Sequence, residues 1–183
     1  MRPRFYIVGD IHGSYEKLIA IHRKISVKMK HGDFLIFLGD YIDRGPASFN
    51  VIEFLISISD NRTVFIAGNH ERMLIDYIAG KVDYSLYSYN GGDSTLKSYR
   101  EMTGSVSLPP SHENFFNGLV RYYEGSDFIA VHAGLRPGFV SLDNQTDHDL
   151  VWIREPFFRS EHRFQKTVIF GHINLAPLAL LPG

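Results

Sequence analysis

The stretch FLIFLGDYIDRGP, residues 34–46, runs a nearly unbroken apolar segment directly into Asp40, Asp43 and Arg44. A surface turn would use Asp and Gly without so apolar an approach, and an ordinary core strand would not end in three charges. Short apolar runs bounded by turn residues are typical of buried strands. We therefore predict a buried strand over 33–40 that delivers polar side chains to one edge of a sheet.

The rest of the chain alternates short apolar runs with longer amphipathic stretches, which is the pattern of α/β folds. Further strands are predicted over 5–10, 63–71, 127–134 and 167–173. Helices are predicted over 14–29, 48–58, about 72–78 and 111–123. The Tyr-, Ser- and Gly-rich stretch 81–110 predicts a short helical insert with loops. No repeat or linker divides the chain, so we expect a single α/β domain over residues 1–183.

Composition excludes several classes of protein. The 183 residues are 44% hydrophobic with a net charge of -1, which favours a globular chain and gives no electrostatic case for nucleic acid or a membrane surface. The absence of cysteine excludes disulfides and thiolate sites. The sequence contains no GxxxxGK[ST], GxGxxG or GxSxG motif. Their absence argues against a nucleotide-dependent kinase, a dehydrogenase and a serine hydrolase, respectively. Without a signal peptide or a long apolar segment, we expect a cytoplasmic protein.

Five apolar runs end in a small residue beside a metal-ligand type of residue: IVGD, FLGD, IAGN, AVHAG and IFGH. Ligands of open α/β sheets gather outside the carboxyl ends of the strands, so these endings are expected to converge. The candidate ligands are Asp10, His12, Asp40, Asn69, His132 and His172. The other histidines have no such context and are treated as background: His22, His31, His112, His148 and His162.

Six ligand-type side chains are too many for one tetrahedral ion, but they suffice for two ions that share a carboxylate. Carboxylate and imidazole together favour Mn, Fe or Zn. Two neighbouring metals are the usual arrangement for hydrolysis of phosphate esters. The fragment GDIHG taken alone, with Asp10 and His12, has a simpler alternative as a turn aspartate beside a surface histidine.

Phosphate chemistry also needs cationic side chains and a proton donor. The planar guanidinium groups of Arg44 and Arg154 would suit phosphate oxygens, although Arg154 has the alternative of a surface ion pair with Glu155 or Asp149. His70 would act as general acid, with Asp43 as the acidic partner that keeps it protonated and oriented.

These motifs, in this order, resemble those of calcineurin-type metallophosphoesterases: GDIHG (9–13), GDYIDRG (39–45), GNHE (68–71), HAG (132–134) and GH (171–172). The resemblance is to the phosphoprotein phosphatase branch. Three further segments resemble a bacterial subgroup that includes Ser/Thr phosphatases and symmetrical diadenosine tetraphosphate hydrolases: NGGDSTLKSY (90–99), HAGLRPG (132–138) and DLVWIREPF (149–157).

The resemblance implies a two-sheet αββα fold with a βαβαβ motif and two divalent metal ions, most commonly manganese. Asp10, His12 and Asp40 would hold the first ion, and Asp40 would bridge to a second ion held by Asn69, His132 and His172. A metal-bridging hydroxide would attack phosphorus in line. His70, paired with Asp43, would protonate the leaving group, while Arg44 and Arg154 hold the phosphate.

The end of the chain departs from this pattern. Relatives continue from GHT through further strands, whereas this sequence reads GHINLAPLALLPG, so we expect the closing C-terminal strands to be shortened or replaced. The first functional hypothesis is a Ser/Thr protein phosphatase acting on phosphoproteins or small phosphoesters. The alternatives are a dinucleoside polyphosphate hydrolase and a shortened, non-catalytic metal-binding relative.

Overall fold

Two three-stranded sheets pack face to face in the computed structural model, which describes residues 2–138, 141–161 and 164–173. The first sheet has the order β1 (Phe5–Val8), β2 (Phe34–Phe37), β3 (Thr63–Phe65), and all its pairings are parallel. The second has the order β4 (Tyr122–Glu124), β5 (Phe128–Val131), β6 (Thr167–Ile169). Strand β5 pairs antiparallel with β4 and parallel with β6.

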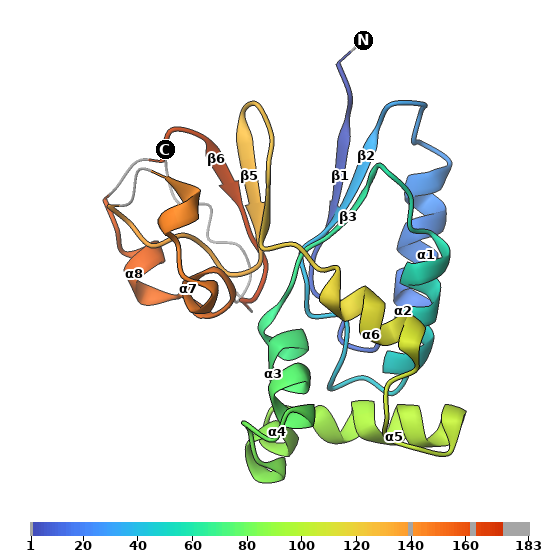
Figure 1. Ribbon diagram of the computed structural model, residues 1–183. Helices are drawn as coiled ribbons and strands as arrows, with labels where there is room; N and C mark the ends of the chain where they lie inside the picture. The colour runs from blue at the N-terminus through green and yellow to red at the C-terminus, as the bar shows by residue number, and fades with distance from the viewer. Residues whose placement is uncertain (1, 139–140, 162–163, 174–183) are drawn as a thin grey trace.

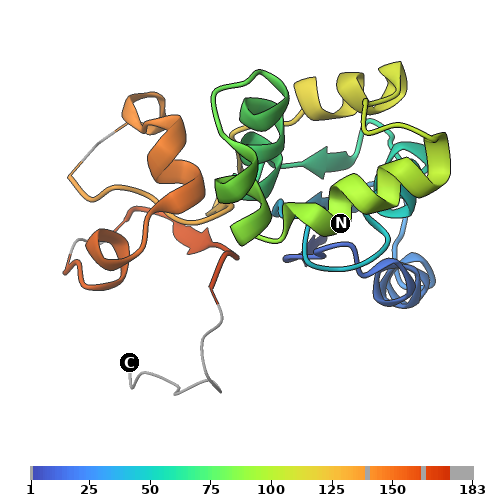
Figure 2. The ribbon, with the colours of Figure 1, turned by 90° about the horizontal axis from the view of Figure 1, so that it is seen from below.

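Helices cover the outer face of each sheet, which completes the predicted αββα arrangement (Figure 1). Helices α1 (Tyr15–Ser26), α2 (Ser48–Ser57) and α6 (Pro110–Asn117) lie beside the first sheet, and α7 (Asp147–Trp152) and α8 (Glu155–Phe158) lie beside the second. A short 3-10 helix, Leu142–Asn144, precedes α7. Helices α3 (Asn69–Ile78), α4 (Tyr84–Tyr89) and α5 (Gly92–Thr103) lie beyond the carboxyl ends of the first sheet, and Figure 2 shows them from below.

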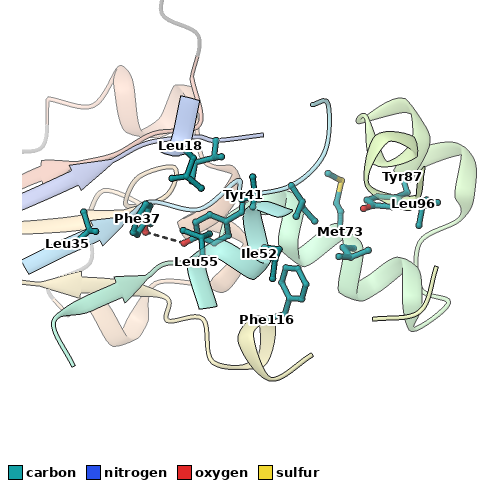
Figure 3. Close-up of a cluster of buried hydrophobic side chains, with 14 of the residues drawn as sticks. Leu18, Leu35, Phe37, Tyr41, Ile52, Leu55, Met73, Tyr87, Leu96 and Phe116 are labelled. Atoms are coloured by element: carbon teal, nitrogen blue, oxygen red, sulfur yellow. Dashed lines mark hydrogen bonds between the residues drawn. The ribbon is translucent and has the colours of Figure 1, made fainter. Parts of the chain in front are cut away.

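Three apolar clusters hold these layers together. Ile36, Leu38, Ile66 and Ala130 pack between the two sheets, since residues of both sheets contribute to one cluster. The largest cluster lies between the first sheet and its helices and continues to Tyr87 and Leu96 of the α4–α5 segment (Figure 3). Packing of the two inner faces holds the carboxyl ends of β1, β2 and β3 beside those of β5 and β6, whereas β4 runs the other way.

The start of helix α3 differs from the prediction, and the difference matters for function. Helix α3 begins at Asn69, not near Arg72, so Asn69 and His70 lie in its first turn. The Glu71 carboxylate accepts the backbone N–H of Gly68 at 2.9 Å, which satisfies a donor that the start of a helix leaves unpaired. The third strand is correspondingly shorter than predicted and ends at Phe65.

Other differences concern segments that carry weak sequence signals. The predicted insert over 81–110 contains two well-formed helices, α4 and α5, and the predicted helix over 111–123 ends at Asn117 and is followed by strand β4. Helices α7 and α8 were not predicted. No helix within the described ranges is long and apolar enough to cross a membrane. The prediction of shortened closing strands concerns the chain after Ile173, which lies outside the described residues.

Candidate functional site

Side chains from both sheets meet where the strands end. Asp40 follows β2, Asn69 begins α3, His132 follows β5 and His172 follows β6. His132 Nε2 lies 2.9 Å from Asn69 Oδ1, 3.2 Å from His172 Nδ1 and 3.4 Å from Asp40 Oδ1. The structure therefore brings together four of the six predicted ligands from positions spread over more than half of the chain.

Asp40 belongs to two groups of ligand atoms. Asp40, His132 and His172 form one group, and His12, Asp40 and His70 form the other, with the ligand atoms in each group within 4.8 Å of one another. The carboxylate is 2% exposed and lies between them. Burial, with the neighbouring charge of Asp10, raises the pKa of the Asp40 carboxyl well above its ordinary value. A cation at either group would offset the cost of that buried charge.

The chemistry of the donor set fits divalent metals. His12 Nδ1 donates to the Ile42 carbonyl at 3.0 Å and His132 Nδ1 donates to the Leu38 carbonyl at 2.7 Å, which leaves the lone pair of each Nε2 facing the cluster. Burial lowers the pKa of His132 well below its ordinary value and that of His172 to about 4, so both imidazoles are neutral at pH 7, as metal ligation requires.

Asp10 lies at the margin of this cluster. Its carboxylate is 4.0 Å from His12 Nε2, and its Oδ1 accepts the backbone N–H of His172 at 3.2 Å. The group of His12, Asp40 and His70 contains His70, whereas the resemblance implies Asp10 beside His12 and Asp40. In this structure Asp10 connects the strand end of β1 to the strand end of β6, and it remains a predicted ligand.

The proposed general acid and its partner are in direct contact. His70 Nδ1 lies 2.7 Å from Asp43 Oδ2, and both residues are fully buried. Arg44 places its guanidinium between two imidazoles, 2.8 Å from His12 Nε2 and 2.9 Å from His70 Nε2. Because a guanidinium can only donate, the Nε2 atoms of both imidazoles accept hydrogen bonds from Arg44 in this structure.

Arg154 does not form the alternative surface ion pair with Glu155 or Asp149. Asp149 pairs with Arg136 at 2.5 Å and Glu155 pairs with Arg159. Arg154 instead donates from Nε to His172 Nε2 at 3.3 Å, so its guanidinium lies at the metal-ligand cluster.

Glu71 is a site residue to which the sequence analysis assigned no role. Its carboxylate accepts the backbone N–H groups of Asp40 at 2.9 Å and Tyr41 at 2.8 Å, besides that of Gly68. Burial, followed by the nearby Asp40 carboxylate, raises the pKa of Glu71 to about 8. Asp40 has φ 53, an uncommon conformation for a residue with a side chain. The hydrogen bonds from the Asp40 and Tyr41 N–H groups to Glu71 stabilise the backbone in this conformation. The position of Glu71 in the motif GNHE was the available signal.

A cavity of about 870 Å³ opens from the cluster. Arg44, Arg154 and His172 lie on its wall, and helix α1 contributes Lys17 and Ile21. Phe158 of α8 also lines it, and Ile21 and Phe158 are each 40% exposed. The cavity is therefore lined by charged side chains, which include Asp10 and Glu155, and by apolar ones.

Comparison with known proteins identifies the family. The model of the family described as calcineurin-like phosphoesterase matches residues 3–180. The chain belongs to this family. The match confirms the predicted family, and the two-sheet fold is consistent with it. Family membership also makes the chain a phosphoesterase, an enzyme class that uses divalent metals.

Curated relatives are similar over most of the chain. The asymmetrical bis(5'-nucleosyl)-tetraphosphatase PrpE of Geobacillus thermodenitrificans is 29% identical over 91% of this chain, and PrpE of a Geobacillus species is 27% identical over 76%. The symmetrical bis(5'-nucleosyl)-tetraphosphatase of Psychromonas ingrahamii is 29% identical over 72%. The chain spans 77%, 60% and 44% of the lengths of these three proteins.

A solved crystal structure provisionally assigned as a diadenosine tetraphosphatase has the same fold. It superposes with a TM-score of 0.68 and 23% identity, covering 94% of this chain and 76% of that one. At this identity the likeness concerns the fold alone.

Proposed function

We propose that this phosphoesterase hydrolyses phosphoric esters and anhydrides at the cluster around Asp40, with two bound divalent ions. The observation that carries the proposal is the pair of ligand groups that share Asp40 beside the buried His70–Asp43 contact. Asp40 would belong to both ions, Asp10 and His12 to the first, and Asn69, His132 and His172 to the second. Such ions, when bound, activate water and neutralise charge on phosphoryl oxygens.

The remaining groups would bind the substrate and move a proton. Arg44 and Arg154 would hold the non-bridging oxygens of the phosphate that is attacked, because both guanidinium groups border the cavity at the cluster. His70 would donate a proton from Nε2 to the departing oxygen, while Asp43 fixes Nδ1–H on the opposite side of the ring. Burial of the pair keeps bulk water from competing for that proton.

The preferred substrate class in this proposal is a dinucleoside polyphosphate. The comparisons favour this alternative from the sequence analysis over a Ser/Thr protein phosphatase, because the similar curated relatives are named as tetraphosphatases. The cavity supports the same choice, since Ile21 and Phe158 offer apolar walls to a nucleobase. Exposed Lys17, which lines the same cavity, offers a cation to the polyphosphate chain.

Manganese is the ion we propose, with iron or zinc as the alternatives that the mixed carboxylate and imidazole set also accepts. A cytoplasmic location and a single domain over the whole chain remain predictions from the sequence. The substrate test compares diadenosine tetraphosphate with a phosphoserine peptide and p-nitrophenyl phosphate in the presence of Mn²⁺, with products separated by chromatography.

The expected result is turnover of diadenosine tetraphosphate with a higher kcat/KM than the phosphopeptide. ADP alone would identify cleavage at the central anhydride bond, and ATP with AMP would identify asymmetrical cleavage. A higher kcat/KM for the phosphopeptide would restore the protein phosphatase hypothesis. No turnover of any of the three substrates, with metals bound, would favour the non-catalytic alternative.

A further inference from the structure

The α4–α5 segment lies beyond the carboxyl ends of the first sheet (Figure 1). Its Tyr87 and Thr95 hydroxyls both donate to Asp43. We propose that Tyr87 and Thr95 of this segment are positioning residues that orient the His70–Asp43 pair for proton transfer to the leaving group. The inference rests on the proposed function, because it concerns the proton donor of that reaction. The sequence analysis predicted a short helical insert with loops here and assigned no role to Tyr87 or Thr95.

The two oxygens of Asp43 have separate partners. Oδ2 faces His70 Nδ1 at 2.7 Å, whereas Oδ1 accepts the Tyr87 hydroxyl at 2.8 Å and the Thr95 hydroxyl at 2.6 Å. All four residues are buried. Two donors on Oδ1 prevent the carboxylate from rotating, so Oδ2 remains directed at the imidazole.

Thr95 also fixes the backbone of the residue that it orients. Its Oγ1 accepts the backbone N–H of Asp43 at 2.9 Å while donating to the same residue's Oδ1. Ser48 of α2 assists, since its hydroxyl lies 2.9 Å from Thr95 Oγ1 and 3.2 Å from the Asp43 nitrogen. The Thr95 hydroxyl therefore contacts both the main chain and the carboxylate of Asp43.

The turn held in this way has an uncommon backbone conformation. Asp43 and Arg44 are consecutive residues with φ 69 and φ 66, in the left-handed region that residues with side chains rarely adopt. The Arg44 N–H donates to the Gly91 carbonyl at 3.0 Å, so the α4–α5 segment also fixes the second residue of the turn. Within the turn itself, the Gly45 N–H donates to the Asp43 carbonyl at 2.7 Å, so the contacts from the α4–α5 segment add to one local hydrogen bond.

Two glycines allow the segment to come this close. A Cβ on Gly91 would lie 2.8 Å from Arg44 Cγ, and a Cβ on Gly92 would lie 2.5 Å from the Tyr87 ring. The sequence NGGDST over 90–95 is thus accounted for by its approach to the Asp43–Arg44 turn and to Tyr87. Burial raises the pKa of the Tyr87 phenol well above its ordinary value, so the hydroxyl retains the proton that it donates.

The test uses aryl phosphates whose leaving groups differ in their need for a proton. Thr95→Val and Tyr87→Phe each remove one hydroxyl and little volume. With Mn²⁺ present, we expect Thr95→Val to lower kcat for phenyl phosphate, a poor leaving group, by about tenfold or more, within the range of general acid catalysis. For 2,4-dinitrophenyl phosphate, whose leaving group needs no proton, the change should stay below about threefold. Tyr87→Phe should show the same trend with a smaller loss.

Two further variants serve as controls. Thr95→Ser retains the hydroxyl and should restore the activity on phenyl phosphate. Tyr99→Phe removes another buried tyrosine hydroxyl of the same segment, one that contacts His112 Nδ1 at 2.7 Å, and should leave the two substrates in their wild-type ratio. In a His70→Asn background, Thr95→Val should cause no further loss, because it acts through the imidazole.

A readout independent of turnover is the ¹H resonance of the His70 Nδ1 proton in the metal-free protein. It should shift in Thr95→Val and Tyr87→Phe and stay in place in Tyr99→Phe. Equal losses for both aryl phosphates, an unshifted resonance, or an undiminished effect in the His70→Asn background would overturn the inference alone. Should Thr95→Val not fold, Tyr87→Phe decides by the same criteria. A wild-type protein that hydrolyses no phosphoester would instead overturn the proposed function together with the inference.

Discussion

His70 Nδ1 lies 2.7 Å from Asp43 Oδ2, although 27 positions separate the two residues, and neither side chain is accessible to solvent. One residue is in the first turn of α3 and the other is in the turn after β2. The contact depends on the packing of α3 against the end of the first sheet. It couples the orientation of the imidazole to the same turn that carries Arg44.

Replacement of the proposed proton donor tests this pair directly. We expect His70→Asn to lower kcat for phenyl phosphate by roughly 10²–10⁴, the usual contribution of a positioned general acid. Asp43→Asn should lower it less, because the imidazole stays in place. Steady-state kinetics with metal content measured on the same samples checks the prediction. An unchanged kcat in His70→Asn, at wild-type metal content, would assign proton donation to another group.

Asp40 is the residue on which metal binding should depend most. Since it belongs to both ligand groups, Asp40→Asn should abolish tight binding of both ions, whereas His172→Ala should abolish only one. Elemental analysis after dialysis measures the stoichiometry. Asp33→Asn is the matched control, because Asp33 is a buried aspartate whose partners are Arg4 and Lys30 and which takes no part in the cluster. Wild-type stoichiometry in Asp40→Asn would contradict the bridging role.

The cavity predicts which side chains select the substrate. Phe158→Ala and Lys17→Met should lower kcat/KM for diadenosine tetraphosphate about tenfold, while p-nitrophenyl phosphate, which does not reach the apolar wall, loses less. Lys24→Met, on the same helix but outside the cavity lining, is the control for loss of a lysine charge. Equal losses on both substrates would mean that these residues support the fold, not recognition.

A fourth prediction concerns stability away from the site. Hydrogen bonds from the Arg4 guanidinium, then from the backbone N–H groups of Arg4 and Lys30, hold the pKa of Asp33 well below its ordinary value. As the pH falls, the unfolded chain therefore takes up this proton first. The stabilisation is complete above about pH 4, the ordinary value for aspartate, and is lost as the pH falls toward the folded-state pKa.

Thermal unfolding of the metal-free protein measures this effect. Asp33→Asn should lower Tm at pH 7, and the difference from the wild type should shrink progressively below pH 4. A Tm difference that is the same at pH 7 and at the lowest pH where the protein folds would show that the carboxylate charge contributes nothing.

The sequence predicted the site best where a metal-ligand type of residue directly follows an apolar run. The apolar runs before Asp40, Asn69 and His132 predicted strand ends, and because parallel strands share an edge, their convergence could be inferred without coordinates. The pairing of His70 with Asp43 was proposed from the resemblance and from chemical type, and the two side chains are in contact in the structure.

The residues that escaped prediction act through contacts with no local pattern. Thr95 and Tyr87 lie in the Tyr-, Ser- and Gly-rich stretch that was predicted as a short helical insert with loops. Nothing in the sequence indicates that the Thr95 hydroxyl contacts an aspartate 52 residues earlier. Helix α7 was missed because its six residues are too few to establish a helical period. Glu71 lay within a quoted motif, yet its role depends on backbone N–H groups about 30 positions away.

The central claim is that two metal ions share Asp40. Anomalous diffraction from crystals grown with Mn²⁺ measures this directly. The account predicts two manganese peaks, one on each side of the Asp40 carboxylate, roughly 3.5–4 Å apart as in other two-metal sites. One ion would contact His12, and the other would contact Asn69, His132 and His172. A single peak, or peaks that do not contact Asp40, would contradict the claim.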